Sequence, residues 1–121
     1  MQSLLNTSLS ALGAFGVGMQ VTANNIANVN THEFKAERAH YETGPMGEGV
    51  RLSEISRDTS PGPITDTVSL STLSMPMREG SNVSLEQEFV QMISTENGYT
   101  ANAHVISTYE DMAGTVINMK V

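Results

Sequence analysis

The sequence predicts a mainly α-helical protein in which an N-terminal and a C-terminal helix pair in a coiled-coil-like manner around a small β-rich or irregular insert. Apolar residues recur at helical spacing near both ends of the 121-residue chain. The segment between them carries turn signals and short alternating stretches instead. The length allows one domain, and an aromatic content of only 5% argues against a large self-sufficient core.

The N-terminal helix is expected within residues 1–31, ending near residue 30 at Asn and Thr residues that terminate helices well. Its apolar positions are spaced 4-3-4-3-4-3, a heptad seam that predicts packing against another helix. Gly13, Gly16 and Gly18 each lower helix stability by about 1 kcal/mol relative to Ala, so the helix should form only when packed. The seam consists of Leu5, Leu9, Leu12, Gly16, Met19, Ala23 and Ile26.

This first segment carries no charge, since Glu33 is the first charged residue of the chain. Ordinary surface helices carry charged residues on their outer face. Neutral polar side chains can be satisfied by protein neighbours, whereas a buried charge costs several kcal/mol unless it is paired. We interpret the segment as enclosed by protein on most sides, and the alternative is a chance composition in a flexible tail.

A cleaved signal peptide is not expected at the N-terminus. The longest apolar run, from Ala11 to Met19, contains three glycines and follows no positively charged region. It is also shorter than the roughly 20 residues that a membrane span requires. If the protein leaves the cytoplasm, we expect it to do so without a cleaved Sec-type signal.

Residues 32–80 are expected to form the insert. Residues 34–41 and 50–55 have the alternating character of short strands. The insert is too short for a sandwich or barrel of its own. The expected loop and turn are residues 44–49 and 60–63, and a weak strand is expected at residues 68–72.

The C-terminal helix is expected within residues 81–121. Ser84 and Gln87 form a capping-box pattern, and Glu86 and Glu88 suit the positive end of the helix dipole. Two neighbouring apolar stripes predict more than one packing partner. The N-terminal helix can cover the first, and either another subunit or the chain's own insert can cover the second. The first stripe is Leu85, Phe89, Met92, Tyr99, Ala103, Ile106, Ala113 and Ile117, and the second is Val90, Ile93, Val105, Tyr109, Met112, Val116 and Met119.

The sequence predicts no catalytic, cofactor or metal site. His32-Glu33 lacks the second histidine of a zinc-protease helix, because position 36 is Ala. The acidic residues of the C-terminal segment, Glu88 among them, are spread along the helix and are interpreted as a solvated face. A net charge of −7 excludes a nucleic-acid footprint, and the lack of cysteine excludes disulfides and thiolate metal sites.

Both ends of the chain resemble the signature segments of the bacterial flagellar rod and hook protein family. The run Ala-Asn-Asn-Ile-Ala-Asn-Val-Asn-Thr at residues 23–31 is its most specific part. Family members usually have glycine before the Phe-Lys pair, where this chain has Glu33. The resembling segments are residues 8–12, 21–31, 34–35 and 38 at one end, and 80–85, 88–93 and positions up to Met112 at the other.

The resemblance implies a non-catalytic structural subunit of the flagellar basal-body rod, short and similar to proximal-rod members. It implies terminal helices that pair antiparallel, with residues 32–80 as an extended arm and insert. It also implies assembly with other rod subunits, and with copies of itself, into a helical tube that transmits torque. Export through the flagellar type III apparatus would deliver the chain to the periplasmic rod, without a cofactor, a nucleic acid or a membrane span.

The alternative is a stand-alone helix-pair binding module or a secreted flagellar accessory factor. An assembling subunit must bury its second stripe between protomers, whereas a monomeric module must cover it with its own insert. We expect assembly contacts along the whole N-terminal seam and, on the C-terminal helix, at Leu85, Phe89, Met92, Tyr99, Ile106, Tyr109, Met112, Val116, Ile117 and Met119.

Overall fold

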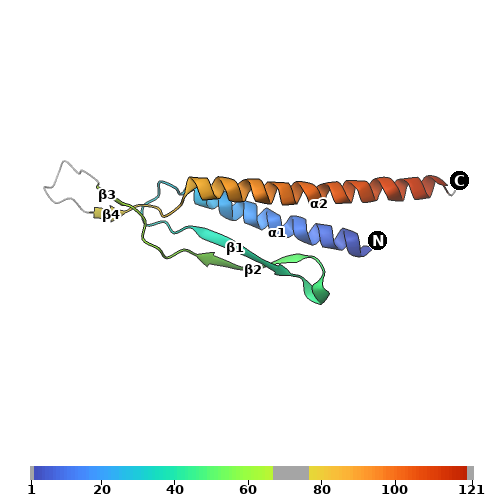
Figure 1. Ribbon diagram of the computed structural model, residues 1–121, viewed down its shortest axis with the longest axis horizontal. Helices are drawn as coiled ribbons and strands as arrows, with labels where there is room; N and C mark the ends of the chain where they lie inside the picture. Colours follow the sequence, from blue (N-terminus) through green and yellow to red (C-terminus); the bar gives the residue numbers. More distant parts are fainter. Residues whose placement is uncertain (1, 67–76, 120–121) are drawn as a thin grey trace.

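Two long antiparallel helices dominate the computed structural model, which describes residues 2–66 and 77–119. Helix α1 spans Gln2–Ala27 and helix α2 spans Leu85–Met119. The two lie side by side, and α2 continues beyond the N-terminal end of α1 (Figure 1). The predicted mainly α fold with two paired terminal helices is confirmed.

The packed face of α1 is not the predicted heptad seam. Leu9 and Ala23 of the seam are exposed, and its other members are only half-buried. The seam borders the packed face because α1 packs against α2 and against a β-hairpin as well, and the small side chains of that face allow both to approach closely. The larger apolar residues flank this double contact. The buried residues of α1 are Ser8, Ala11, Ala14, Gly18, Val21, Thr22 and Asn25.

Phe15 of α1 lies where this helix meets both α2 and the hairpin. Its ring meets that of Tyr41 edge to face, with ring centroids 5.7 Å apart. A Cβ atom at Gly98 of α2 would lie 3.1 Å from the Phe15 ring, and one at Gly18 would lie 1.8 Å from the Tyr41 hydroxyl. These two glycines therefore allow the helices and the hairpin to meet. Burial raises the pKa of Tyr41.

The insert contains two antiparallel hairpins. Strand β1, Glu37–Thr43, pairs with strand β2, Val50–Arg57, and this hairpin lies against α1 (Figure 1). The short 3-10 helix η1, Pro45–Gly47, forms the connection between them. These strands confirm the predicted extended stretches and the loop. The predicted strand at residues 68–72 lies outside the described residues.

Strands β3, Ile64–Asp66, and β4, Met77–Glu79, form the second hairpin at the end of the molecule where α2 begins (Figure 1). Neither strand was predicted, because three residues are too few to establish an alternating pattern. The predicted turn at residues 60–63 lies directly before β3.

The chain leaves α1 at Ala27, three residues earlier than predicted, because Asn28 turns back on the helix. Its side-chain amide donates a hydrogen bond to the Asn24 carbonyl at 2.8 Å. The following turn ends at Glu33, whose φ of 60° is in the left-handed region. Glycine adopts this conformation readily, which explains physically why a glycine suits the position before Phe34.

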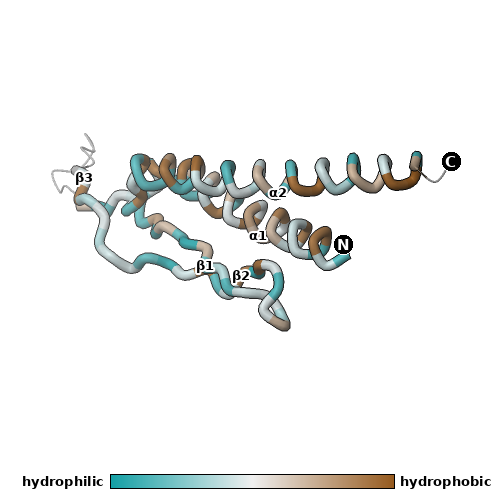
Figure 2. The backbone as a smooth tube through the Cα atoms, turned by 45° about the vertical axis from the view of Figure 1, so that its right-hand side comes forward, coloured by the Kyte–Doolittle hydropathy of each residue, from teal (hydrophilic) through white to brown (hydrophobic). Residues whose placement is uncertain are grey.

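Helix α2 buries very little of its surface within the described chain. Only Glu88 and Thr95 are buried, although the helix has 35 residues. Apolar residues recur along its whole length, including the part beyond α1 (Figure 2). No helix among the described residues is long and apolar enough to cross a membrane.

Candidate functional site

A polar junction of Asn25, Arg38, Asn82 and Glu88 holds the two helices and the insert together. Asn25 is fully buried near the end of α1. Its Oδ1 accepts a hydrogen bond from the Glu37 backbone N–H at 2.9 Å, and its Nδ2 donates to the Glu37 carbonyl at 2.7 Å. The side chain therefore binds β1 as a neighbouring strand would.

Glu88 joins α2 to this junction. Its Oε2 accepts a second hydrogen bond from Asn25 Nδ2 at 3.1 Å, and its Oε1 pairs with the Arg38 guanidinium. Glu88 is completely buried, so its prediction as part of a solvated face was wrong. A buried carboxylate is tolerated here because both of its oxygens have donors. Arg38 also donates to Gln87 Oε1 at 3.2 Å, so the predicted capping-box glutamine serves the junction.

Asn82 holds the start and the end of the β1–β2 hairpin together just before α2. Its Oδ1 accepts from the Ala36 backbone N–H at 2.7 Å. Its Nδ2 donates to the carbonyls of Asp58 at 2.9 Å and Ser60 at 3.0 Å. All three segments are thereby fixed relative to the first turn of α2.

A second ion pair, between Lys35 and Glu79, joins the hairpin region to β4. The Lys35 ammonium and the Gly62 backbone N–H, which donates at 2.6 Å, lower the pKa of Glu79 below its ordinary value of 4.5. Hydrogen bonds from Ser60 likewise lower the pKa of Asp58. Both carboxylates therefore stabilise the fold in their charged form.

Sequence reasoning did not find this junction, although its members lie within the signature segments. One signal was present for Asn25. Asparagine is unfavourable inside a helix, so its presence there indicates a specific hydrogen-bonding task. Nothing in the sequence indicates that Arg38, Asn82 and Glu88 meet, because they come from segments far apart in the chain.

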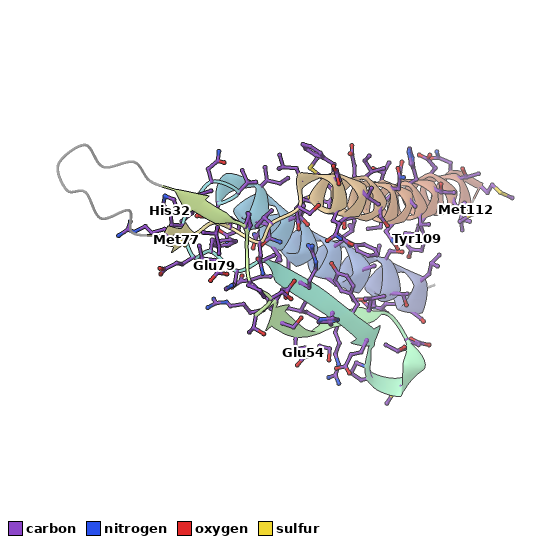
Figure 3. All side chains as sticks on the ribbon, turned by 60° about the vertical axis from the view of Figure 1, so that its left-hand side comes forward. His32, Glu54, Met77, Glu79, Tyr109 and Met112 are labelled. Carbon is purple, nitrogen blue, oxygen red and sulfur yellow. The ribbon has the colours of Figure 1, made fainter. Side chains whose placement is uncertain are left out.

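Outside the polar junction, α2 exposes an extensive apolar surface. Most of the α2 residues predicted to make assembly contacts are exposed, whereas Met92, Ile106 and Tyr109 are half-buried. Figure 3 shows Tyr109 and Met112 on the C-terminal half of α2, far from the end where Met77 and Glu79 lie. The exposed predicted residues are Leu85, Phe89, Tyr99, Met112, Val116, Ile117 and Met119.

The apolar seam of α1 forms a second, narrower surface. Leu9 is 61% exposed, and Leu5, Leu12, Gly16, Met19 and Ile26 are half-buried along the border of the packed face. A side chain at Gly13 or Gly16 would meet nothing within 4 Å. Another backbone could therefore approach this helix closely.

Charge separates the two surfaces. Helix α1 has no charged residue, whereas α2 has no Lys or Arg and, besides the buried Glu88, four exposed acidic residues. In the described residues, the four ion pairs use Lys35, Arg38, Arg51 and Arg57 of the insert. The outer face of α2 is therefore both apolar and acidic.

The three histidines of the chain are dispersed through the fold. His32 lies in the turn after α1, His40 in β1 and His104 in α2. The His40 Nε2 lies 2.6 Å from the Ser56 hydroxyl across the hairpin. The described residues thus form two long paired helices with exposed apolar faces, braced by a small β insert.

Comparison with known proteins gives the class of this protein. Residues 5–35 match the family model described as "Flagella basal body rod protein". Residues 77–119 match the model for the C-terminal region of the flagellar basal body rod FlgEFG proteins. The chain is 30% identical to the flagellar basal-body rod protein FlgC of Borreliella burgdorferi, in an alignment that covers 91% of each. The chain belongs to the flagellar basal-body rod protein family. It is a structural subunit of the flagellar basal body and not an enzyme.

Proposed function

We propose that the exposed faces of α1 and α2 are the contacts through which this rod subunit assembles into a helical axial tube that transmits torque. The single observation that carries this proposal is the exposure of α2. Helix α2 extends about 52 Å, and ten of its large apolar residues are exposed. A helix of this kind is stable only when other helices cover it.

The charge distribution favours α1 of a neighbouring subunit as one cover for α2. Two acidic outer faces of α2 would repel each other across a low-dielectric contact. The uncharged α1, which is open at Gly16, brings no such penalty. Contacts can form with copies of this chain and with other rod proteins, since related subunits would present similar helices.

We also propose that the chain reaches the periplasmic part of the basal body unfolded, through the flagellar type III export apparatus. The small apolar core supports this proposal. Among the described residues, only Ala11, Ala14, Val21 and Ala36 are buried apolar residues. Little packing would have to be undone before export, and the neighbouring subunits would supply the missing contacts afterwards.

The test replaces Met112 and Val116, both exposed on α2, with serine. The double variant should keep its intrachain helix pair and its export, because neither side chain is buried within the described chain. Its incorporation into basal bodies should fall, since each lost apolar contact is worth about 1–3 kcal/mol per interface. The measurements are motility, secreted protein and the content of this subunit in purified basal bodies.

A matched control replaces the exposed polar residue Asn118 of the same helix with serine. This variant should assemble normally. Normal motility and incorporation of the Met112/Val116 double variant would contradict the proposed contact. A double variant that is secreted and monomeric but still functional would support the stand-alone module instead.

A further inference from the structure

The turn between β1 and β2 presents an apolar side chain directly to water. Met46 is 102% exposed, more than any other large apolar residue of the described chain. A fully exposed methionine gains nothing for the isolated fold. Its backbone is also strained, because φ is 63° in a residue that has a side chain.

The structure holds this strained turn firmly in place. The Gly44 N–H donates to the Gly49 carbonyl at 3.1 Å, and Pro45 restricts the backbone directly before Met46. Two serines of α1 brace the far side: Ser3 donates to Glu48 Oε2 at 2.9 Å, and Ser10 accepts from the Val50 N–H at 3.2 Å. The backbone on either side of Met46 is therefore held in place, which lowers the entropy cost of binding.

A shallow groove with an apolar lining lies beside α1 and β2. Its volume is about 280 Å³, enough for one unbranched side chain. Gly13 forms part of its wall and leaves open space above α1. Methionine suits such an irregular groove because its side chain is flexible and polarisable. The groove is lined by Ser10, Gly13, Ala14, Val17, Val50, Arg51 and Leu52.

The rim of the groove and the turn carry opposite charges. Arg51 on the rim is 59% exposed and uses its Nε to bind Glu42 Oε1 at 2.7 Å. Its guanidinium can bind a further carboxylate through the two amino groups. Glu48, two residues after Met46, is exposed beside the apolar tip. The turn therefore offers an apolar side chain and, two residues later, a carboxylate, and the groove offers an apolar lining with a cation at its rim.

We infer that the turn of residues 44–49 docks onto a second copy of this chain, with Met46 in the groove beside Gly13 and Glu48 against Arg51. The turn does not fill its own groove, since Met46 is fully exposed. A contact between two different surfaces of identical subunits can repeat from copy to copy, and it produces a helical array when it does not close. The inference rests on the proposed assembly function and adds to it a contact that involves neither α2 nor the junction.

The chain has no cysteine, so single introduced thiols can report on this contact directly. One tagged copy carries Met46→Cys and an untagged copy carries Gly13→Cys, and both are expressed in the same cells. Treating purified basal bodies with a short bis-maleimide should yield the mixed dimer, which its size separates from either homodimer. Replacing Gly13→Cys with Gln20→Cys, also exposed on α1, is the matched control and should give several-fold less mixed dimer.

A second set of variants separates a docking role from a merely structural one. Met46→Gly relieves the positive φ, so the helical signal of the chain should stay the same or rise. Its incorporation into basal bodies should nevertheless fall, as should that of Met46→Glu. Met46→Leu should be incorporated normally. If Met46 served only the fold, the incorporation of Met46→Gly into basal bodies would not fall.

Two results would overturn the inference. One is an absence of mixed dimer in basal bodies that contain both variants, together with normal incorporation of Met46→Glu. The other is cross-linking of Met46→Cys to a different protein only. Either result would leave the proposed assembly role of α2 intact as long as the Met112/Val116 double variant still fails to assemble.

Discussion

Replacing Glu88 with alanine should loosen the whole molecule, although the residue lies in the first turn of an exposed helix. The substitution removes an acceptor from the buried Asn25 amide and the partner of Arg38. Breaking a buried ion pair typically costs about 3–5 kcal/mol. The Arg38 side chain is 32% exposed and can be partly rehydrated, so we expect the loss to be about 2–4 kcal/mol.

Glu86 provides the control, because it is an exposed acid in the same turn of α2. Glu86→Ala removes only a favourable interaction with the helix dipole, worth about 0.3–1 kcal/mol. Glu88→Gln should fall between the two alanine variants, since it can still accept a hydrogen bond from Asn25 but loses the charge that binds Arg38. Circular dichroism reports the helix content of each variant, and amide hydrogen exchange reports protection at residues 36–39 and 85–90.

Rapid exchange should appear in the Glu88→Ala protein at both the start of α2 and the start of β1, because the junction connects them. Exchange should be almost unchanged in Glu86→Ala. Equal protection in the two alanine variants would refute the reasoning, since it would mean that the buried carboxylate does not hold the segments together.

Three further outcomes are expected. In the isolated chain, amide exchange should show protection around the junction and little at the N-terminal end of α1 or the C-terminal end of α2; protection from residue 5 onward would contradict this. Glu33→Gly should raise the free energy of unfolding by about 0.5–1 kcal/mol, because glycine adopts the φ of 60° without strain; an unchanged or lower value by denaturant titration would contradict it. Acid should weaken the contact between the Lys35 region and β4. Because the folded pKa of Glu79 lies below its ordinary value of 4.5, the stabilisation is present above that value and is lost as the pH falls through the folded pKa. Glu79→Gln should flatten this pH dependence in a titration followed by circular dichroism.

The existence and type of the main elements could be predicted from local patterns. The capping signals before Leu85, the apolar spacing at both ends and the alternation in residues 34–41 and 50–55 are properties of short stretches of chain. Helices and strands depend on such local periodicity, and the exclusion of catalytic chemistry depends on composition and spacing.

The face that each helix turns inward could not be predicted in this way. On α1, the largest apolar residues lie at the border of the contact, and Ser8, Gly18, Thr22 and Asn25 lie inside it. Small size and hydrogen-bonding capacity decide this choice, because α1 must touch both α2 and the hairpin at close range. A hydrophobic pattern contains no information about how many neighbours a helix has.

The buried Glu88 shows the same limit most clearly. By sequence it is an acidic residue at the N-terminal end of a helix, where solvent exposure is the ordinary outcome. Only the tertiary structure brings the Asn25 amide and the Arg38 guanidinium to its two oxygens. Burial of a charge depends on partners that are far away in the chain, and the folded arrangement alone brings them together.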